Sequence, residues 1–253
     1  MCGVAGFTHA NGVSDGGVAR RMAEVLVHRG PDQQGIHDSG DVSLCAVRLK
    51  IIDLGGGDQP MVSPDGTTAI AFNGEIYNHA ALRRELEGMG HRFRSRCDTE
   101  VVLEAFRAWD SACFERLRGM FAVAISAEGG KRLVLARDRV GIKPLYFHRR
   151  GGELLFGSEL KAIFAHPDAP RRLNLEALGH YLSLNWVPCP WTLAEGIEKL
   201  PPGHLLEWRG GKIEVRPWWR LEFRPRKTWS LGAAKKELDR LLREAVKEHL
   251  VSD

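Results

Sequence analysis

The sequence predicts an α+β fold in which antiparallel sheets are covered on the outside by helices. Strand-like segments lie close together in pairs, and three of the short connections contain adjacent glycines, as tight hairpin turns do: Gly129-Gly130, Gly151-Gly152 and Gly210-Gly211. Segments with helical periodicity are grouped between sets of strands. This grouping favours antiparallel sheets with the helices packed on their outer faces.

The expected strands are rich in apolar and β-branched residues and end at glycine-rich or charged turns. One of them alternates apolar and basic residues in its second half, from Val47 to Ile52. In chain order the expected strands are Gly3–His9, Val42–Ile52, Thr67–Phe72, Gly119–Ser126, Arg132–Asp138, Lys143–His148, Glu153–Gly157, Leu205–Trp208 and Lys212–Trp218.

Helices are expected where apolar residues recur at helical spacing. Asn78 and Asp98-Thr99 are candidate N-caps for two of them. The helix after Asn78 would bury Leu82, Leu86 and Met89. The other expected helices are Val18–Val27, Ser158–Phe164, Leu175–Leu184 and Leu231–Leu250.

The composition is that of a globular cytoplasmic protein. The chain has 253 residues, of which 43% are hydrophobic and 27% charged. No apolar run approaches a membrane span of about 18 residues, and no signal peptide opens the chain. The five cysteines are odd in number and lack C-x-x-C spacing, which argues against disulfides and zinc and for the cytoplasm. His28, His79 and His180 show no metal-ligand spacing, so no metal is expected.

The net charge of +4 lies entirely in residues 201–253, where basic residues are interleaved with acidic residues and tryptophans. We interpret this region as a solvated or docking surface and expect no nucleic-acid partner. Trp218, Trp219 and Trp229 are candidates for an exposed docking face, which leaves a homodimer open.

Two units are expected along the chain. Residues 2–222 hold the sheets and the helices that cover them, and residues 223–253 hold a linker and one amphipathic helix. Ser230 is a candidate cap for that helix. The apolar stripe of Leu231–Leu250 requires a packing partner that this chain does not offer.

Cys2 follows the initiator methionine and is the candidate nucleophile. If Met1 is removed, Cys2 carries a thiol and a free α-amine on one carbon, so one residue supplies both nucleophile and base. An α-amine titrates near 7.7–8.0 and is therefore about one-tenth neutral at pH 7. A strand that merely begins with a small apolar residue is the competing interpretation.

Asn73-Gly74 follows a strand and offers a carboxamide N–H and an unhindered backbone N–H. Such a pair can bind a developing oxyanion. Asn-Gly is also the strongest short hairpin signal, so a type I′ turn is the competing interpretation.

Arg48, Glu75 and Asp98 are candidates for binding an amino acid by its charged groups. Arg48 could hold a carboxylate bidentately, or be a surface arginine on an alternating strand. Asp98 could hold an ammonium group as well as cap its helix, and Glu75 could do the same or form an unrelated salt bridge. Together with Cys2 and Asn73-Gly74, these groups match glutamine positioned for thiolate attack on its amide.

Short segments along the chain resemble the class II glutamine amidotransferases, which are N-terminal nucleophile hydrolases: Cys2–Gly6, His28–Asp32, Arg48-Leu49, Gln59-Pro60, Asn73–Asn78 and Asp98–Glu100. Later segments resemble the asparagine synthetase branch of this family: Gly119–Ala122, Ala136–Arg139, Gly141–Tyr146, Gly157–Lys161 and Lys199–His204. Relatives that aminate sugar phosphates carry a Thr-Arg-Trp-type segment where this chain has Val47–Lys50. Each segment is weak alone, but their shared order over about Cys2 to Trp219 makes the resemblance specific.

The resemblance implies an αββα sandwich of two antiparallel sheets, with Cys2 as the nucleophile and its own amine as the base. It implies that Asn73 and Gly74 form the oxyanion hole. It also implies that Arg48, Glu75 and Asp98 bind glutamine, with further contacts from Leu49 and Ile52.

In the resembling family, the counterpart of Glu237–Asp253 leads into a synthetase domain that binds ATP and Mg²⁺ and activates aspartate. This chain contains no Gly-rich phosphate motif of that kind, so we expect a truncated chain without a cofactor of its own. The expected reaction is ATP-independent hydrolysis of glutamine through a Cys2 thioester. In the parent protein the ammonia would serve ATP-dependent amidation of aspartate.

Two alternatives remain at this level. The chain could be a non-catalytic glutamine-binding or docking module. The presence of Cys2 directly after Met1 argues against this alternative. It could also be the amidotransferase half of a related synthetase that acts on a different acceptor.

Overall fold

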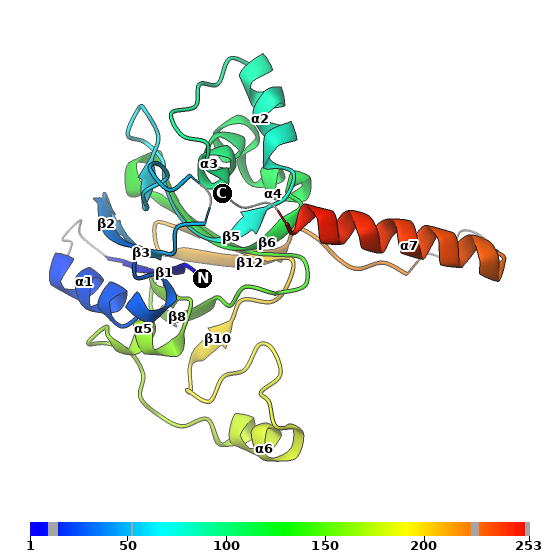
Figure 1. Cartoon of the computed structure of the whole chain (residues 1–253). Coiled ribbons are helices and arrows are strands. Elements are labelled where there is room, and N and C mark those ends of the chain that lie inside the picture. The colour runs from blue at the N-terminus through cyan, green and yellow to red at the C-terminus, as the bar shows by residue number, and fades with distance from the viewer. Residues whose placement is uncertain (10–14, 52, 224–227, 251–253) are drawn as a thin grey trace.

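The computed structural model describes residues 1–9, 15–51, 53–223 and 228–250. These residues form two six-stranded antiparallel sheets that stack on one another, with helices on the outer face of each sheet (Figure 1). The predicted α+β fold and its αββα sandwich are confirmed.

Sheet A has the strand order β10-β8-β9-β1-β3-β2. Its strands are β1 (Gly3–Thr8), β2 (Gln33–Ser39), β3 (Val42–Arg48), β8 (Tyr146–Arg150), β9 (Glu153–Gly157) and β10 (Ile197–Lys199). Because β1 pairs with β3 on one side and β9 on the other, the N-terminal strand lies inside the sheet and is completely buried.

Sheet B has the strand order β12-β11-β7-β6-β5-β4. Its strands are β4 (Met61–Val62), β5 (Ala69–Ile76), β6 (Gly119–Ala127), β7 (Arg132–Arg137), β11 (His204–Arg209) and β12 (Lys212–Pro217). Strand β4 pairs only with Ala69 and Ile70 of β5, so the rest of that edge of β5 is not covered by a strand.

Period-two alternation along the strands builds three apolar layers. In β5, Ala71 points between the sheets, whereas Ile70 and Phe72 point to the helices outside sheet B. Those helices are α2 (His79–Gly88), α3 (Asp98–Trp109) and α4 (Cys113–Arg116). The outer face of sheet A packs on α1 (Gly16–Glu24) and α5 (Leu160–Phe164).

Several predicted strand limits are wrong. The strand predicted over Val42–Ile52 ends at Arg48, and residues 49–51 leave the sheet. The strand predicted from Lys143 begins at Tyr146, because residues 138–145 form a loop held by polar contacts.

Two details of the predicted helices are also wrong. Asn78 precedes α2 without capping it, since its side chain instead bonds the backbone of Arg116 and Arg118, each at 2.9 Å. Met89 lies just past α2 and is 52% exposed.

The prediction that Trp218 is exposed is wrong. Its ring packs in the core beside Phe121, in the apolar layer between sheet B and α4.

Two further helices project from the sandwich, α6 (Leu175–Leu184) and α7 (Leu231–Glu248) (Figure 1). Ser230 caps α7 as predicted, accepting a hydrogen bond from Ala233 N at 3.2 Å. None of the α7 residues is buried, but its final turn returns to the sandwich, where Glu248 pairs with Arg118 at 2.8 Å. Among the described residues, no helix is both long and apolar enough to cross a membrane.

Candidate active site

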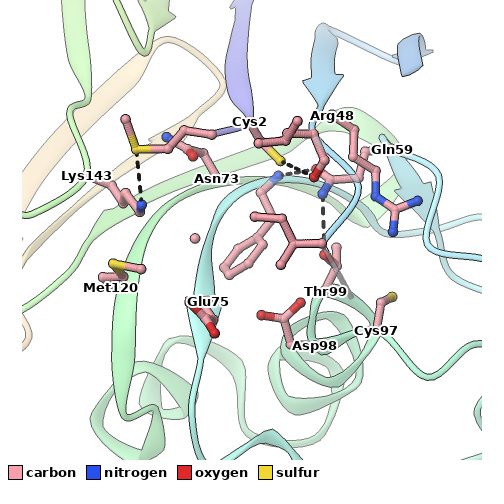
Figure 2. Close-up of a pocket in the computed structure, with 15 residues that line it drawn as sticks. Cys2, Arg48, Gln59, Asn73, Glu75, Cys97, Asp98, Thr99, Met120 and Lys143 are labelled. Atoms are coloured by element: carbon pink, nitrogen blue, oxygen red, sulfur yellow. Dashed lines mark hydrogen bonds between the residues drawn. The ribbon is translucent and has the colours of Figure 1, made fainter. Parts of the chain in front are cut away.

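A pocket opens between the start of β1 and the uncovered edge of β5 (Figure 2). It brings together the predicted residues from segments that are far apart in the sequence. Its lining residues are Met1, Cys2, Arg48, Leu49, Ile51, Gln59, Phe72, Asn73, Gly74, Glu75, Cys97, Asp98, Thr99, Met120 and Lys143.

Cys2 and Asn73 both point into the space between the sheets. Val4 belongs to the layer between the sheets, and Cys2 lies two residues earlier, so it has the same facing. Ala71 belongs to that layer too, and Asn73 lies two residues later on β5. The sandwich therefore places the thiol and the carboxamide on facing sheets, at one edge.

The Cys2 thiol is partly buried and donates a weak hydrogen bond to Leu49 O, at 3.7 Å. Burial raises the pKa of this thiol, while the N-terminal amine and Arg48 oppose the shift. A thiol in this setting needs a base nearby to become the thiolate nucleophile.

Asn73 and Gly74 lie inside β5, so the type I′ turn interpretation is wrong. Register pairs Gly74 with Phe121, whose N–H and C=O both bond Asp138 on the far side, at 3.2 and 2.8 Å. Gly74 and Phe121 are therefore a non-hydrogen-bonded pair, and the Gly74 N–H points away from β6.

Along the uncovered edge of β5, the backbone N–H groups on either side of Gly74 donate to side chains. Phe72 N donates to Gln59 Oε1 at 2.7 Å, and Ile76 N donates to Asp98 Oδ2 at 2.9 Å. The Gly74 N–H lies between these two on the same edge, facing the pocket. A side chain at position 74 would lie 2.3 Å from Met120 O, so only glycine fits there.

The carboxamide of Asn73 supplies a second donor. Asn73 is 1% exposed, and among the described residues its Nδ2 atom has no hydrogen-bond partner. A buried amide without a partner is costly, and such groups cluster at sites that bind a ligand. Asn73 Nδ2 and the Gly74 N–H, two donors without partners among the described residues, line the same pocket as the thiol and have the composition of an oxyanion hole.

Asp98 and Glu75 point toward one another on the far side of the pocket from Cys2 (Figure 2). Asp98 begins α3 but does not cap it, because Cys97 occupies the N-cap position and the Asp98 carboxylate bonds Ile76 N. Burial raises the pKa of Asp98 to about 6 and also raises that of Glu75. Two desolvated carboxylates beside one another favour a cation between them.

Arg48 is 4% exposed, so the alternative of a surface arginine is wrong. Its guanidinium donates to the carbonyl oxygens of Asp53, at 2.9 Å, and Gly56, and lies 3.5 Å from Asp58 Oδ1. These contacts fix Arg48 in the pocket wall. That Arg48 binds the carboxylate of glutamine stays a prediction. Leu49 also lines the pocket, and Ile52 lies outside the described residues.

Sequence reasoning gave no role to several pocket residues: Gln59, Cys97, Thr99, Met120 and Lys143. All except Cys97 lie in segments that carry the family resemblance, and this resemblance was the signal that could have identified them as site residues. Gln59 has a positioning role that only tertiary structure reveals. Besides bonding Phe72 N, it donates from Nε2 to Thr99 Oγ1 at 3.3 Å, which ties β5 to the start of α3.

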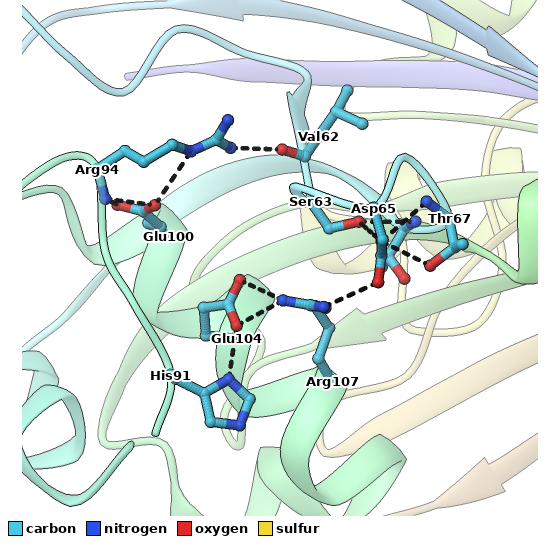
Figure 3. Close-up of polar contacts among 10 residues, drawn as sticks. Val62, Ser63, Asp65, Thr67, His91, Arg94, Glu100, Glu104 and Arg107 are labelled. Carbon is cyan, nitrogen blue, oxygen red and sulfur yellow. Dashed lines mark hydrogen bonds and ion pairs between the residues drawn. The ribbon is translucent and has the colours of Figure 1, made fainter. Parts of the chain in front are cut away.

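The segment leading into Asp98 is held by two buried carboxylates on α3 (Figure 3). Glu100 accepts from Ser95 N at 2.7 Å and from Arg94 N at 2.9 Å. Glu104, 2% exposed, accepts from His91 at 2.6 Å and from Arg107 at 2.9 and 2.8 Å. Arg107 continues to Asp65 at 2.8 Å, which joins α3 to the loop before β5.

We expect Glu104→Ala to lower the free energy of unfolding by about 2–3 kcal/mol, because Arg107 and His91 lose their buried partner. Urea denaturation measures the change. Glu85→Ala is the matched control, since its pair with Arg116 is on the surface and worth at most about 1 kcal/mol. Equal losses in the two variants would show that the buried network does not stabilise this region.

Among the described residues, no group of three or more His, Cys, Asp or Glu side chains could hold a metal ion.

The architecture and the cysteine at the start of an internal strand define the N-terminal nucleophile hydrolase fold. In fold, the chain is similar to the solved glutamine phosphoribosylpyrophosphate amidotransferase of Bacillus subtilis, with a TM-score of 0.62 and 19% identity over 85% of this chain and 49% of that one. A family model described as glutamine amidotransferase domain matches residues 1–219, and the chain belongs to that family.

Curated relatives confirm the resemblance to the asparagine synthetase branch. The chain is 35% identical to asparagine synthetase [glutamine-hydrolyzing] 3 of Bacillus subtilis and 36% identical to asparagine synthetase [glutamine-hydrolyzing] 1 of that organism. Both matches include 100% of this chain but only 42% and 40% of the relative. The chain therefore spans about two-fifths of the length of these proteins.

Proposed function

We propose that this chain hydrolyses glutamine to glutamate and ammonia, with Cys2 as the nucleophile once Met1 has been removed. The observation that carries the proposal is that one pocket holds the Cys2 thiol and two donors, Asn73 Nδ2 and the Gly74 N–H on the open edge of β5, which have no partner among the described residues. Glutamine offers an amide carbonyl for that arrangement, and the pocket carries charged groups of both signs for its α-carbon substituents.

The first half of the reaction forms a thioester. The α-amine of Cys2 takes the thiol proton, and the thiolate attacks the side-chain amide carbon of glutamine. The carbonyl oxygen gains the negative charge and accepts hydrogen bonds from Asn73 and Gly74. The protonated α-amine then gives its proton to the amide nitrogen, so ammonia leaves and a glutamyl thioester remains on Cys2.

The second half repeats these roles with water. The α-amine, again neutral, takes a proton from a water molecule that attacks the thioester carbon. The same two donors stabilise the second oxyanion. When the intermediate collapses, the Cys2 sulfur leaves and is reprotonated, and glutamate is released.

Substrate recognition uses the two ends of the pocket. The ammonium of glutamine binds between Asp98 and Glu75, two carboxylates whose pKa values are raised by burial. Its carboxylate binds on the side of Arg48, where Leu49 lines the pocket. A contact from Ile52, which lies outside the described residues, stays a prediction. No metal or nucleotide takes part in these steps.

A glutaminase assay without ATP tests the proposal. The purified chain should release glutamate and ammonia in equal amounts from glutamine, and added ATP, Mg²⁺ and aspartate should not change the rate. Glutamine binding without turnover would instead favour a non-catalytic module and overturn the proposal.

The longer relatives suggest a wider context. We propose that in a full-length protein the ammonia is used for ATP-dependent amidation of aspartate, with ATP and Mg²⁺ bound outside residues 1–253. The exposed apolar side chains of α7, such as Leu238 and Leu241, would then pack on that synthetase part. Five free cysteines fit a cytoplasmic setting.

A further inference from the structure

Lys143 is a pocket residue to which the reaction as described gives no role. It follows β7 in a loop that is firmly held. Asp138 accepts hydrogen bonds from the backbone N–H groups of Ile142 and Lys143, both at 2.9 Å. Arg137 donates to the carbonyl oxygens of Gly141 and Lys143, at 2.7 and 2.8 Å. This loop fixes where the lysine side chain enters the pocket.

The ammonium group of Lys143 is buried and forms no ion pair with the described residues, although Glu75 and Asp138 lie close enough to act on it electrostatically. The residue is 6% exposed, and among the described residues its Nζ atom has one polar contact, with Met1 Sδ at 3.4 Å (Figure 2). A thioether is a weak acceptor, so this contact does not offset the cost of burying a charge. Removal of Met1 would take away even that partner, and Cys2, the new first residue, lines the same pocket as Lys143.

We propose that Lys143 is a positioning residue for proton transfer, whose positive charge keeps the α-amine of Cys2 neutral and able to act as the base. The inference rests on the proposed function. A cation beside an amine disfavours the protonated amine, so a larger fraction of the base is in its active form at pH 7. The same charge favours the Cys2 thiolate.

The other charged groups around the N-terminus make further polar contacts of their own. Arg29 donates to Cys2 O at 3.0 Å but is paired with Glu159 at 2.8 Å. On the acidic side, Asp32 accepts from Lys50 N and Asp138 from the loop backbone.

Two acids remain within the pocket, Glu75 and Asp98, and both belong to the proposed ammonium site. Bound substrate would neutralise them, while Lys143 would keep its charge without an ion pair to the described residues. With Met1 in place, burial lowers the pKa of the N-terminal amine. Arg29 and Lys143 add to that shift, and Cys2 and Asp32 oppose it.

The test is the pH dependence of kcat for glutamine hydrolysis in Lys143→Met, at saturating glutamine so that Asp98 and Glu75 are occupied. A like charge several ångströms away shifts a pKa by about one unit, so the acidic limb should move up by about one pH unit. The rate at pH 7 should fall by up to about tenfold and recover at pH 9. Lys143→Arg, which keeps the charge, should keep the limb at its wild-type position.

A loss of rate in Lys143→Met that is equal at every pH, or a limb that does not move, would overturn the role of Lys143. An inactive wild-type chain would overturn the proposed function instead, so the two failures are distinguishable. A second measurement needs no variant. NMR titration of the α-amine in the mature wild-type protein should give a pKa below 7.7–8.0, the ordinary range, and a value in or above that range contradicts the inference.

Discussion

Replacing Cys2 by alanine is expected to abolish glutamine hydrolysis, with a loss in kcat of at least about 10⁴-fold. Removal of the nucleophile of a covalent mechanism leaves only the donors and the binding groups, which give little acceleration alone. Steady-state release of glutamate measures the loss. Because the Cys2 side chain is partly exposed and makes only a weak hydrogen bond, its removal should leave the fold and glutamine binding largely intact.

Cys189→Ala is the matched control for this experiment. Cys189 is also a partly exposed free thiol with a weak contact, to Lys199 O at 3.9 Å, but it does not line the pocket. Its replacement should leave kcat within about twofold of wild type. If Cys2→Ala still turned over glutamine, the nucleophile would be another group and the assignment would fail.

Asn73→Ala is expected to lower kcat by about 10²–10³-fold with a small change in KM. Among the described residues the Asn73 Nδ2 atom has no partner, so we expect its hydrogen bond to form when negative charge develops on the substrate oxygen. Full pH–rate and saturation kinetics would separate the two constants. A rise in KM with unchanged kcat would show that Asn73 binds ground-state glutamine and is not part of an oxyanion hole.

Asn174→Ala provides the comparison for Asn73. Asn174 caps α6 by accepting from Ala177 N at 3.0 Å, away from the pocket. Its removal should cost about 1 kcal/mol of stability without an effect on kcat. This contrast separates loss of a catalytic amide from general destabilisation.

Much of the fold could be predicted from the sequence because local patterns agree with it. Hairpins at paired glycines and the helix Leu175–Leu184 depend on short-range signals, and the structure has them where expected. The predicted ends of strands were wrong where contacts between distant parts of the chain determine where a strand stops. The end of β3 at Arg48, for example, depends on carbonyl oxygens of the 53–58 loop that draw the guanidinium aside.

The residues of the candidate site could be predicted from the sequence, but their positions and orientations in the pocket could not. Asn73-Gly74 has the local preference of a turn, and only pairing with β6 keeps it in a strand with the Gly74 N–H on the open edge. The family resemblance of Gly141–Tyr146 was the only signal at Lys143, since its burial beside Met1 depends on a contact 142 residues apart in sequence.

The central claim is that Cys2 acts as an N-terminal residue with a free amine. Intact-mass spectrometry of active protein, before and after treatment with the glutamine-like electrophile diazo-oxo-norleucine, tests it most directly. We expect loss of Met1 and a single adduct on Cys2, with loss of activity in step with labelling. Active protein that retains Met1, or an adduct on any other residue, would contradict it.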